Sequence, residues 1–196
     1  MARGLISPHT PDWDRLYRQA ECQAGYFTLA QARACGYSRQ LLQKHLEADR
    51  ITRARRGIYR LTRFPATEHE ELVVLWLWSD REGVFSHQTS LALHDLSDAL
   101  PTRVHMTLPE RWRTRRVRVP DGLVLHYADL PESGREWFEL VPVTAPSQVL
   151  SECIAARIAP DLAEQAIRQA RERGLITRQT ARGLTEQLRR TLDGTP

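Results

Sequence analysis

Hydrophobic residues recur every three or four positions in the first part of the chain, which is the spacing of helices with one buried face. The first such stripe comprises Trp13, Leu16, Tyr17, Ala20 and Ala24. Thr10 and Pro11 precede it in the order of an N-cap and a first helical residue, and Gly25 follows it. The pattern therefore predicts a helix that begins after Thr10 and ends before Gly25.

Two shorter helices are expected next. Thr28 and Gln31 have the spacing of a capping box, which opens a helix through about Cys35. Gly36 suits the left-handed conformation that ends a helix, and Ser38 is a favoured N-cap for a third helix, about Arg39 to Ala48. The apolar stripe of this third helix comprises Leu41, Leu42, His45 and Leu46.

A basic hairpin is predicted after the third helix. The runs 51–53 and 58–61 are β-like and flank a turn, 54–57, that contains a glycine. Helix, turn, helix and hairpin in this order form a winged helix-turn-helix, which places one helix in the DNA major groove. The polar face of that helix carries arginine, glutamine and lysine, which suit base edges, and the hairpin carries arginines that suit phosphate. Ordinary solvated charge is the alternative interpretation.

A domain boundary is expected at Phe64-Pro65, between a winged-helix domain over 10–63 and a mixed domain over 66–196. The second domain opens with a segment whose apolar positions cover most of a helix circumference, which predicts a central helix of that domain. Thr67 and Glu70 have the spacing of a capping box at its start.

Strands and helices share the rest of the second domain. The expected strands are 84–85, 104–108, 115–119, 123–128 and 137–143. Pro120-Asp121-Gly122 is a strong turn signal and predicts a hairpin between the third and fourth of these strands. Helices are expected to begin at Ser86, Pro146, Pro160 and Thr177. The expected fold class is α+β, with a winged helix-turn-helix followed by a small antiparallel sheet and helices.

Charge reinforces the assignment of the first domain. Residues 1–63 carry 12 Lys and Arg against 5 Asp and Glu, a net of +7, whereas the remaining residues carry 16 against 19, a net of −3. The positive field therefore coincides with the predicted winged helix. Lys44 is the only lysine, which excludes a P-loop, a kinase-type ATP site, a Schiff-base lysine and a lysine-dependent nuclease core.

Candidate catalytic chemistry is sparse. Several acidic and imidazole side chains could gather into a metal or acid–base site: His87, His94, Asp95, His105 and His126. The favoured interpretation is that His87 and His94 make hydrogen bonds in a mixed core, because no metal-ligand motif is present. Glu152 and Cys153 could form a nucleophile pair, but a buried helical cysteine is commoner. We expect no catalytic residue, metal or cofactor.

An arginine-rich segment interrupts the second domain. Its basic residues are Arg111, Arg113, Arg115, Arg116 and Arg118, with Trp112 among them. This segment is interpreted either as a second nucleic-acid surface or as an edge strand that charge protects from aggregation. No apolar run has the length of a membrane span, and the three cysteines form neither a disulfide framework nor a metal motif, so the expected location is the cytosol.

The segment 26–61 is similar to the winged-helix domain of AbiEi-family antitoxins, which belong to type IV toxin–antitoxin systems. The resemblance extends over about residues 12–175. Its most specific blocks are GYSRQLL, RRGIYRL and FSHQTSLALHDLSD, in that order. The resemblance implies DNA binding through Ser38, Arg39, Gln40, Gln43 and Lys44 of the recognition helix and Arg53, Arg55 and Arg56 of the wing.

The resemblance also implies partners. Proteins of this family bind inverted repeats in their own promoter and repress the operon. Their toxin is a nucleotidyltransferase, which the antitoxin neutralises without a stable contact between the two proteins. Two other classes stay open for this chain: a nuclease or nucleotide-processing enzyme steered by the winged helix, and an interaction module that contacts a toxin. The residues do not indicate the oligomeric state.

Overall fold

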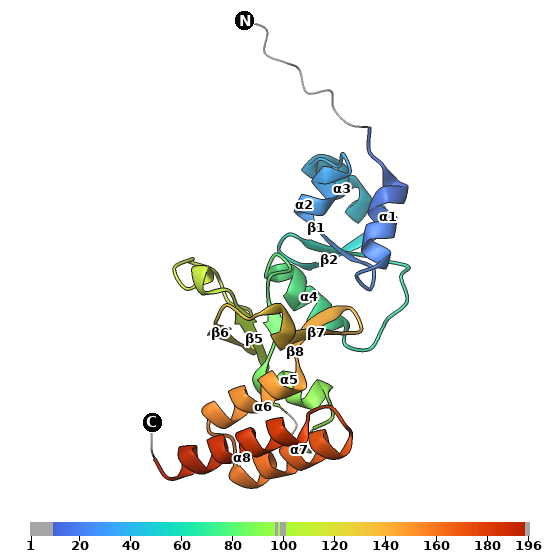
Figure 1. Cartoon of the computed structure of the whole chain (residues 1–196). Helices are drawn as coiled ribbons and strands as arrows, with labels where there is room; N and C mark the ends of the chain where they lie inside the picture. Colours follow the sequence, from blue (N-terminus) through green and yellow to red (C-terminus); the bar gives the residue numbers. More distant parts are fainter. Residues whose placement is uncertain (1–9, 97, 99–100, 195–196) are drawn as a thin grey trace, which may run out of the picture. The chain divides into compact units, whose positions relative to one another are not determined.

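The computed structural model describes residues 10–96, 98 and 101–194, and the chain forms two compact units that divide after Arg81. Figure 1 follows the chain from α1 to α8. The first unit contains α1 (Trp13–Glu21), β1 (Tyr26–Thr28), α2 (Leu29–Ala34), α3 (Arg39–Glu47), β2 (Ile51–Arg55), β3 (Ile58–Leu61) and α4 (Glu70–Trp78). Its first six elements have the order of a winged helix-turn-helix, as the sequence predicts.

A three-stranded antiparallel sheet completes this motif. The strand order is β1-β3-β2, with Tyr26 opposite Arg60 and Ile51 opposite Leu61. The sequence indicated only the β2–β3 hairpin. The strand β1 is three residues long, too short for an alternating pattern, and it forms because β3 offers it a free edge.

The caps of α2 and α3 confirm the local signals. Thr28 Oγ1 accepts a hydrogen bond from Gln31 N at 3.2 Å, and Gln31 Oε1 accepts one from Thr28 N at 2.8 Å. Gly36 has a φ of 84°. The expected start of α1 was wrong, because Asp12 rather than Thr10 is its N-cap and accepts from the backbone N–H of Arg15 at 2.9 Å.

A buried amide pair joins three of these elements. Gln31 Nε2 donates to Gln23 Oε1 at 2.8 Å, and Gln23 Nε2 donates to the carbonyl of Tyr26 at 2.8 Å. Because Gln31 also closes the capping box, one side chain links the end of α1, the strand β1 and the first turn of α2. Buried amides are tolerated only when they are paired in this way.

The core of the first unit collects side chains from every element of the winged helix. Its fully or largely buried members are Leu16, Ala20, Phe27, Ala32, Cys35, Tyr37, Leu42, Ile51, Tyr59 and Leu61. The rings of Trp13 and Phe64 pack against it from its margin. Small residues at Ala20 and Ala32 let the helices approach the sheet closely.

The helix α4 belongs to the first unit, so the boundary expected at Phe64-Pro65 is displaced to Arg81. The helix contacts β1 and β3, and Arg60 Nη2 reaches Glu70 Oε2 at 3.3 Å and the carbonyl of Phe64 at 3.0 Å. The capping box expected from Thr67 is absent. Instead the left-handed His69 precedes the helix, and Glu70 pairs with Arg60 rather than with the backbone of Thr67.

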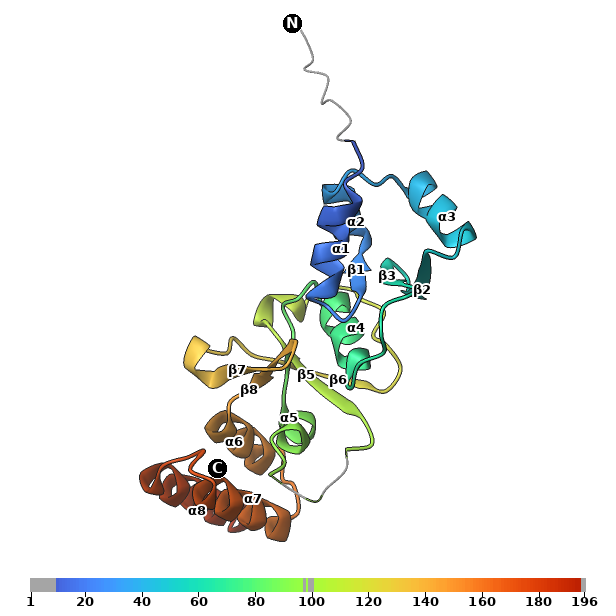
Figure 2. The same cartoon turned by 90° about the vertical axis from the view of Figure 1, so that its right-hand side faces the viewer.

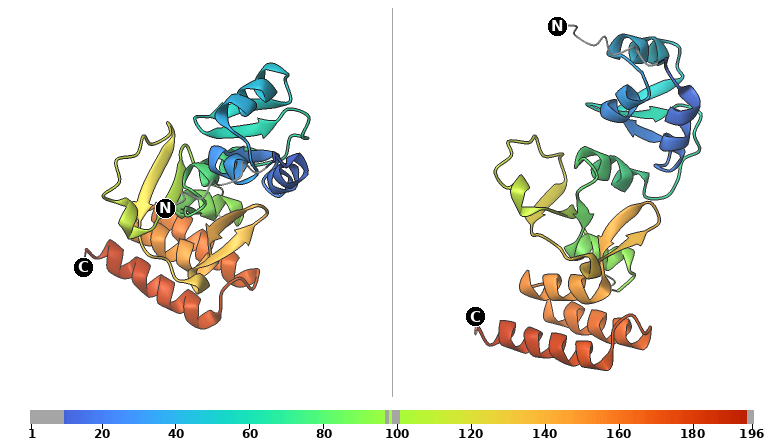
Figure 3. Two further views of the ribbon diagram at one scale, coloured as in Figure 1. Left: turned by 90° about the horizontal axis from the view of Figure 1, so that it is seen from above. Right: turned by 45° about the horizontal axis from the view of Figure 1, so that its top comes forward.

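The second unit is a sheet with helices, as Figures 2 and 3 show. Its strands are β4 (Val84–Phe85), β5 (Val104–Leu108), β6 (Leu123–Tyr127), β7 (Arg135–Phe138) and β8 (Val141–Thr144). Its helices are α5 (His87–Leu93), α6 (Pro146–Ala155), α7 (Pro160–Glu172) and α8 (Arg178–Leu192), with short 3-10 turns at Glu110–Trp112 and Glu132–Gly134. The protein is therefore α+β, as expected.

The sheet of the second unit has the order β6-β5-β4-β8-β7 and is mixed rather than wholly antiparallel. The pairs β5–β6 and β4–β8 are parallel. The helix α5 packs on the sheet, α6 packs on α5, and α7 and α8 pack on α6. The apolar cluster among these helices includes Leu91, Val149, Ile154, Ile167 and Leu184.

The prediction of a hairpin around Pro120-Asp121-Gly122 was wrong. Residues 113–119 form no strand, and 109–122 instead connect two parallel strands, which a tight turn cannot do. The run expected at 137–143 divides into β7 and β8 around Glu139, which has a φ of 50°. The expected starts at Pro146, Pro160 and Thr177 are confirmed.

Gly25 provides a test of the packing in the first unit. It has a φ of 81°, and a Cβ placed there would lie 2.6 Å from Cβ and Cγ of Phe64. Gly57 has a φ of 79° and no atom within 4 Å of such a Cβ. We predict that Gly25→Ala lowers the free energy of unfolding by about 1–3 kcal/mol more than Gly57→Ala, since both incur the left-handed penalty but only the first overpacks.

Urea denaturation followed by circular dichroism measures this difference. Equal losses in the two variants would show that Phe64 moves aside freely and does not hold the chain between β3 and α4.

Candidate nucleic-acid interface

The orientation of α3 is set by its apolar stripe. Leu42 is 1% exposed in the core, and Leu41, His45 and Leu46 are half-buried beside it. A helix that buries these positions must turn its opposite side to solvent. The side chains on that side are Arg39, Gln40, Gln43 and Lys44, and all four are exposed.

Aromatic packing holds the stripe in place. The ring of Trp13 stacks on the ring of His45 with centroids 5.0 Å apart and an interplanar angle of 6°, and Tyr37 meets His45 edge-on. Burial, reinforced by the nearby Arg50 charge, lowers the pKa of His45. At neutral pH this ring is therefore uncharged and behaves as part of the core.

The first turn of α3 is open to solvent. Ser38 is its exposed N-cap, and Ser38 Oγ accepts from the backbone N–H of Leu41 at 3.2 Å. The other amides of the first turn have no partner within the helix, so a helix N-terminus is a natural site for a phosphate. Gln43 Nε2 donates to Glu47 Oε1 at 3.1 Å, so this contact must break before Gln43 can read a base.

The wing is shorter than expected. The strand β2 continues to Arg55 through a bulge after Arg53, so only Arg56 and Gly57 form the turn. The carbonyl of Gly57 accepts from the backbone N–H of Leu29 at 2.8 Å, which ties the tip to the start of α2. The tip is therefore anchored rather than freely projecting.

The arginines of the wing are presented to solvent. Arg53, Arg55 and Arg56 are all exposed, and the guanidinium of Arg53 lies 5.8 Å from the ring centroid of Tyr59. This cation–π contact orients the side chain without neutralising it. The strand β2 also contacts α3, so the recognition helix and the wing are neighbours within one unit. All eight residues named from the sequence are on the surface of this unit.

Three of the five acid–base candidates in the second unit lie together: His87, His105 and His126. The other two do not join them. His94 Nε2 is 2.8 Å from the carbonyl of Thr144, which agrees with its interpretation as a hydrogen-bonding histidine, and the side chain of Asp95 is exposed.

Electrostatics keep the three clustered histidines neutral. Burial lowers the pKa of His87 to about 3, and the neighbouring His126 and His105 add to the effect. Burial also lowers the pKa of His105 and His126. The nearby Glu152 has a raised pKa because of burial, partly offset by hydrogen bonds from Gln148, His87 and Thr144.

The other pair named from the sequence, Glu152 and Cys153, does not act together in the structure. Cys153 is fully buried in the α6–α8 cluster, and burial raises the pKa of its thiol to about 12, so the thiol stays protonated at neutral pH. The sequence linked Glu152 to Cys153, but the structure directs Glu152 to His87 instead. Gln148 and Glu152 are four residues apart on α6, and Gln148 Nε2 donates to Glu152 Oε1. This spacing on a helix that begins at Pro146 could have predicted the pair from the sequence.

The arginine-rich segment is not an edge strand. Arg111 pairs with Glu82, Arg113 pairs with Glu110 at 2.9 Å, and the guanidinium of Arg115 lies 4.2 Å from the ring centroid of Trp112. The ring nitrogen of Trp112 donates to Glu82 at 3.0 Å. Much of the charge in this segment is thus engaged within the second unit.

Sequence comparison agrees with the geometry of the first unit. Residues 14–62 match the model of a family described as transcriptional regulator, AbiEi antitoxin. Residues 14–62 of the first unit are therefore similar to AbiEi regulators. The match runs from α1 to just past β3, which are the elements of the winged helix, and it confirms the family resemblance found in the sequence for this segment.

The other comparisons are distant. The chain is similar to the crystal structure of the RV2827C protein from Mycobacterium tuberculosis, with 12% identity over 93% of this chain and 85% of that chain and a TM-score of 0.44. No curated protein matches the chain. Within the part of the chain that the structure describes, no helix combines the length and apolar character needed to span a bilayer.

Substitutions at Ser38, the N-cap of α3, separate an effect on stability from an effect on DNA binding. We predict that Ser38→Ala lowers the free energy of unfolding by about 1 kcal/mol, whereas Ser38→Asp keeps the cap and the stability. If the helix N-terminus meets a phosphate, Ser38→Asp weakens DNA binding because it adds a negative charge there. Urea denaturation and duplex titration measure the two effects.

Thr177→Ala is the matched control for this pair, because it removes the same kind of cap from α8. It is expected to lower stability without a change in DNA affinity. Unaltered binding by Ser38→Asp would remove the start of α3 from the interface.

Proposed function

We propose that the winged helix of the first unit binds double-stranded DNA with sequence preference and that the protein represses its own promoter. The observation that carries this proposal is the polar face of α3, which the buried Leu42 holds toward solvent in a domain of regulator type. Arg39 and Gln43 lie on this face, and their side chains have the donors and acceptors that pair with guanine and adenine in the major groove.

The binding mechanism is electrostatic attraction with base discrimination added to it. Arg53, Arg55, Arg56, Lys44 and the first turn of α3 contact phosphates and release counterions. About five such contacts give a slope of log affinity against log salt near −4 to −5. Arg39, Gln40 and Gln43 then supply the preference, at about 1–3 kcal/mol for each good bidentate contact.

The biological role we propose is that of an autoregulating antitoxin in the cytoplasm. Its operator consists of inverted repeats in its own promoter, and two copies of the chain bind the two half-sites because a winged-helix unit reads one half-site. The toxin is a nucleotidyltransferase, which the protein neutralises without stable contact. The family match to a transcriptional regulator and antitoxin supports this role.

Base reading is tested on the recognition helix. We predict that Arg39→Ala and Gln43→Ala each lower the difference in binding free energy between promoter DNA and unrelated duplex by about 1–3 kcal/mol, because each removes a base contact. Fluorescence anisotropy with the two duplexes at one salt concentration measures the ratio.

Arg33→Ala is the control for Arg39→Ala. It removes the same charge from an exposed position of α2 and leaves the polar face of α3 intact. Proportional losses on both duplexes in Arg39→Ala and Gln43→Ala would reject base reading by α3.

The wing is tested by the salt dependence of binding. We predict that Arg55→Ala combined with Arg56→Ala weakens binding to all duplexes alike and flattens the log–log salt slope by about 2, because two phosphate contacts are lost. Arg189→Ala combined with Arg190→Ala is the control, since it removes two exposed charges from α8. A slope that matches the control would exclude the wing from DNA contact.

A further inference from the structure

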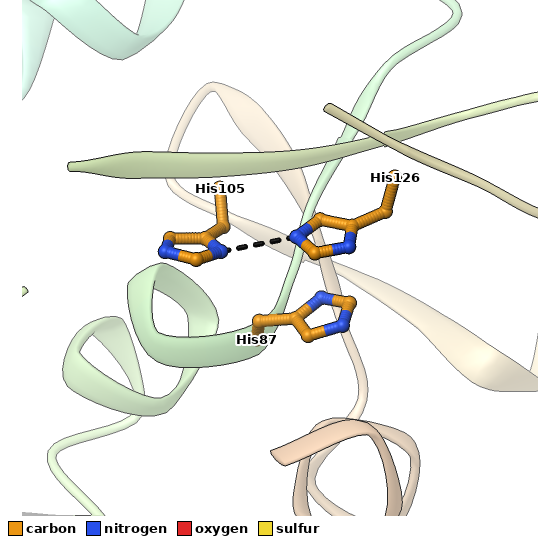
Figure 4. Close-up of side chains that lie close together, drawn as sticks. All are labelled: His87, His105 and His126. Carbon is orange, nitrogen blue, oxygen red and sulfur yellow. Dashed lines mark hydrogen bonds between the residues drawn. The ribbon is translucent and has the colours of Figure 1, made fainter. Parts of the chain in front are cut away.

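Three imidazoles from three separate elements meet in the second unit, as Figure 4 shows. His87 is the first residue of α5, His105 lies on β5 and His126 lies on β6. One ring nitrogen from each residue falls within 4.8 Å of those of the other two. His105 Nδ1 and His126 Nε2 are 3.0 Å apart.

The register of the sheet brings two of these histidines together. In the parallel register of β5 and β6, His105 is opposite Val124 and His126 is opposite Thr107, so both histidines lie on the same face of the sheet. Thr89 Oγ1 of α5 accepts from the backbone N–H of His105 at 2.8 Å, which fixes α5 on that face. His87 is thereby held over the two strands.

We propose that His87, His105 and His126 bind one divalent transition-metal ion of the zinc class. Three imidazole nitrogens are a recurring ligand set for zinc with an open fourth position, and nitrogen ligands favour zinc, cobalt and nickel over magnesium and calcium. Ligand atoms around a tetrahedral zinc ion lie about 3.3 Å apart, as follows from bond lengths near 2.0–2.1 Å. The pair His105 Nδ1 and His126 Nε2, at 3.0 Å, is close to this value, and the three nitrogens together lie within 4.8 Å of one another.

Binding requires a modest rearrangement of the rings. The rings of His87 and His126 now stack with centroids 3.5 Å apart and planes 13° from parallel, and stacked rings direct their lone pairs side by side. Rotation of the His126 ring about χ2 turns its lone pair toward that of His87, whose own ring keeps its Nδ1 contacts. Such terminal torsions are broad and soft, so the rotation costs little free energy.

Outer-shell partners and a route of entry are present. His87 Nδ1 lies 3.0 Å from Ser86 Oγ and 3.8 Å from Glu152 Oε2, the kind of oxygen partners that orient a metal-bound histidine. Glu152 is itself fixed, since Gln148 donates to its Oε1 at 3.0 Å. A cavity of about 400 Å³ is bordered by His87, His126 and Glu152 and gives the fourth ligand position access to solvent.

The experiment uses the full chain without an affinity tag and in a Cys22→Ser background, because a histidine tag and the exposed Cys22 thiol would both compete for metal. Chelator-treated protein is loaded with Zn²⁺, passed through a desalting column and analysed for metal by mass spectrometry. Co²⁺ serves as the spectroscopic probe, since its visible absorption distinguishes a four-coordinate from a six-coordinate ion. The expected result is one equivalent per chain with a tetrahedral Co²⁺ spectrum.

The variants His105→Ala and His126→Ala are expected to lose this equivalent. His94→Gln is the matched control, because it changes a histidine of the same unit outside the cluster and should retain full binding. Glu152→Gln keeps the ligands but alters the outer shell, and it should weaken the affinity about 10–100-fold. Circular dichroism and thermal melting confirm that each variant is folded.

Two results would overturn the metal site. One is a folded parent protein that retains no Zn²⁺ and shows only octahedral Co²⁺, a measurement that depends on no histidine variant. The other is an equivalent of metal that persists in His126→Ala, which would place the ion elsewhere. Neither result bears on DNA binding by the first unit.

Discussion

The burial of Leu42 determines which face of α3 is exposed on the first unit. A helix of nine residues has little stability alone, so α3 exists because its apolar stripe joins the core that contains Leu16, Phe27 and Ile51. That packing also fixes the rotation of the helix about its axis. The exposed arginine, glutamines and lysine are therefore held on one side before any ligand is met, which reduces the conformational entropy lost on binding.

The two units distribute their charge differently. In the first unit the basic residues of α3 and β2 are exposed, and the described contacts show no acidic partner for Arg39, Arg53, Arg55 or Arg56. In the second unit Arg111 and Arg113 pair with glutamates, and Arg173 donates to the backbone carbonyls of His94 and Asp95, just after α5. Unpaired arginines attract an anionic polymer, whereas paired ones hold a fold together, so the same residue type serves two purposes.

Local signals predicted most of the first unit. The capping box at Thr28, the glycine at 36 and the cap at Ser38 act within four residues, and all three were correct. The errors concern pairings between distant residues. The strand β1 depends on its pairing with β3, and the helix α4 joins the first unit through Arg60 and Glu70. The residue pattern of β5 and β6 does not indicate that the two strands pair in parallel.

The candidate sites follow the same division. The exposed residues of α3 could be predicted because helical periodicity assigns a face to each position. The histidine cluster could be named only as a possibility, since His105 and His126 share a face through a register that the sequence does not specify. Glu152 was assigned to the wrong neighbour for the same reason, because α6 approaches α5 only in the finished unit.

The parallel pairing of β4 with β8 bears on the order in which the chain acquires its structure. The antiparallel sheet of the first unit joins segments that are close in sequence, whereas β4 must await β8, nearly sixty residues later, for its parallel partner. Loop-closure entropy makes such distant pairings slow to form. During synthesis the winged helix has all its strands long before the second sheet does, so the chain emerging from the ribosome completes its first unit before its second.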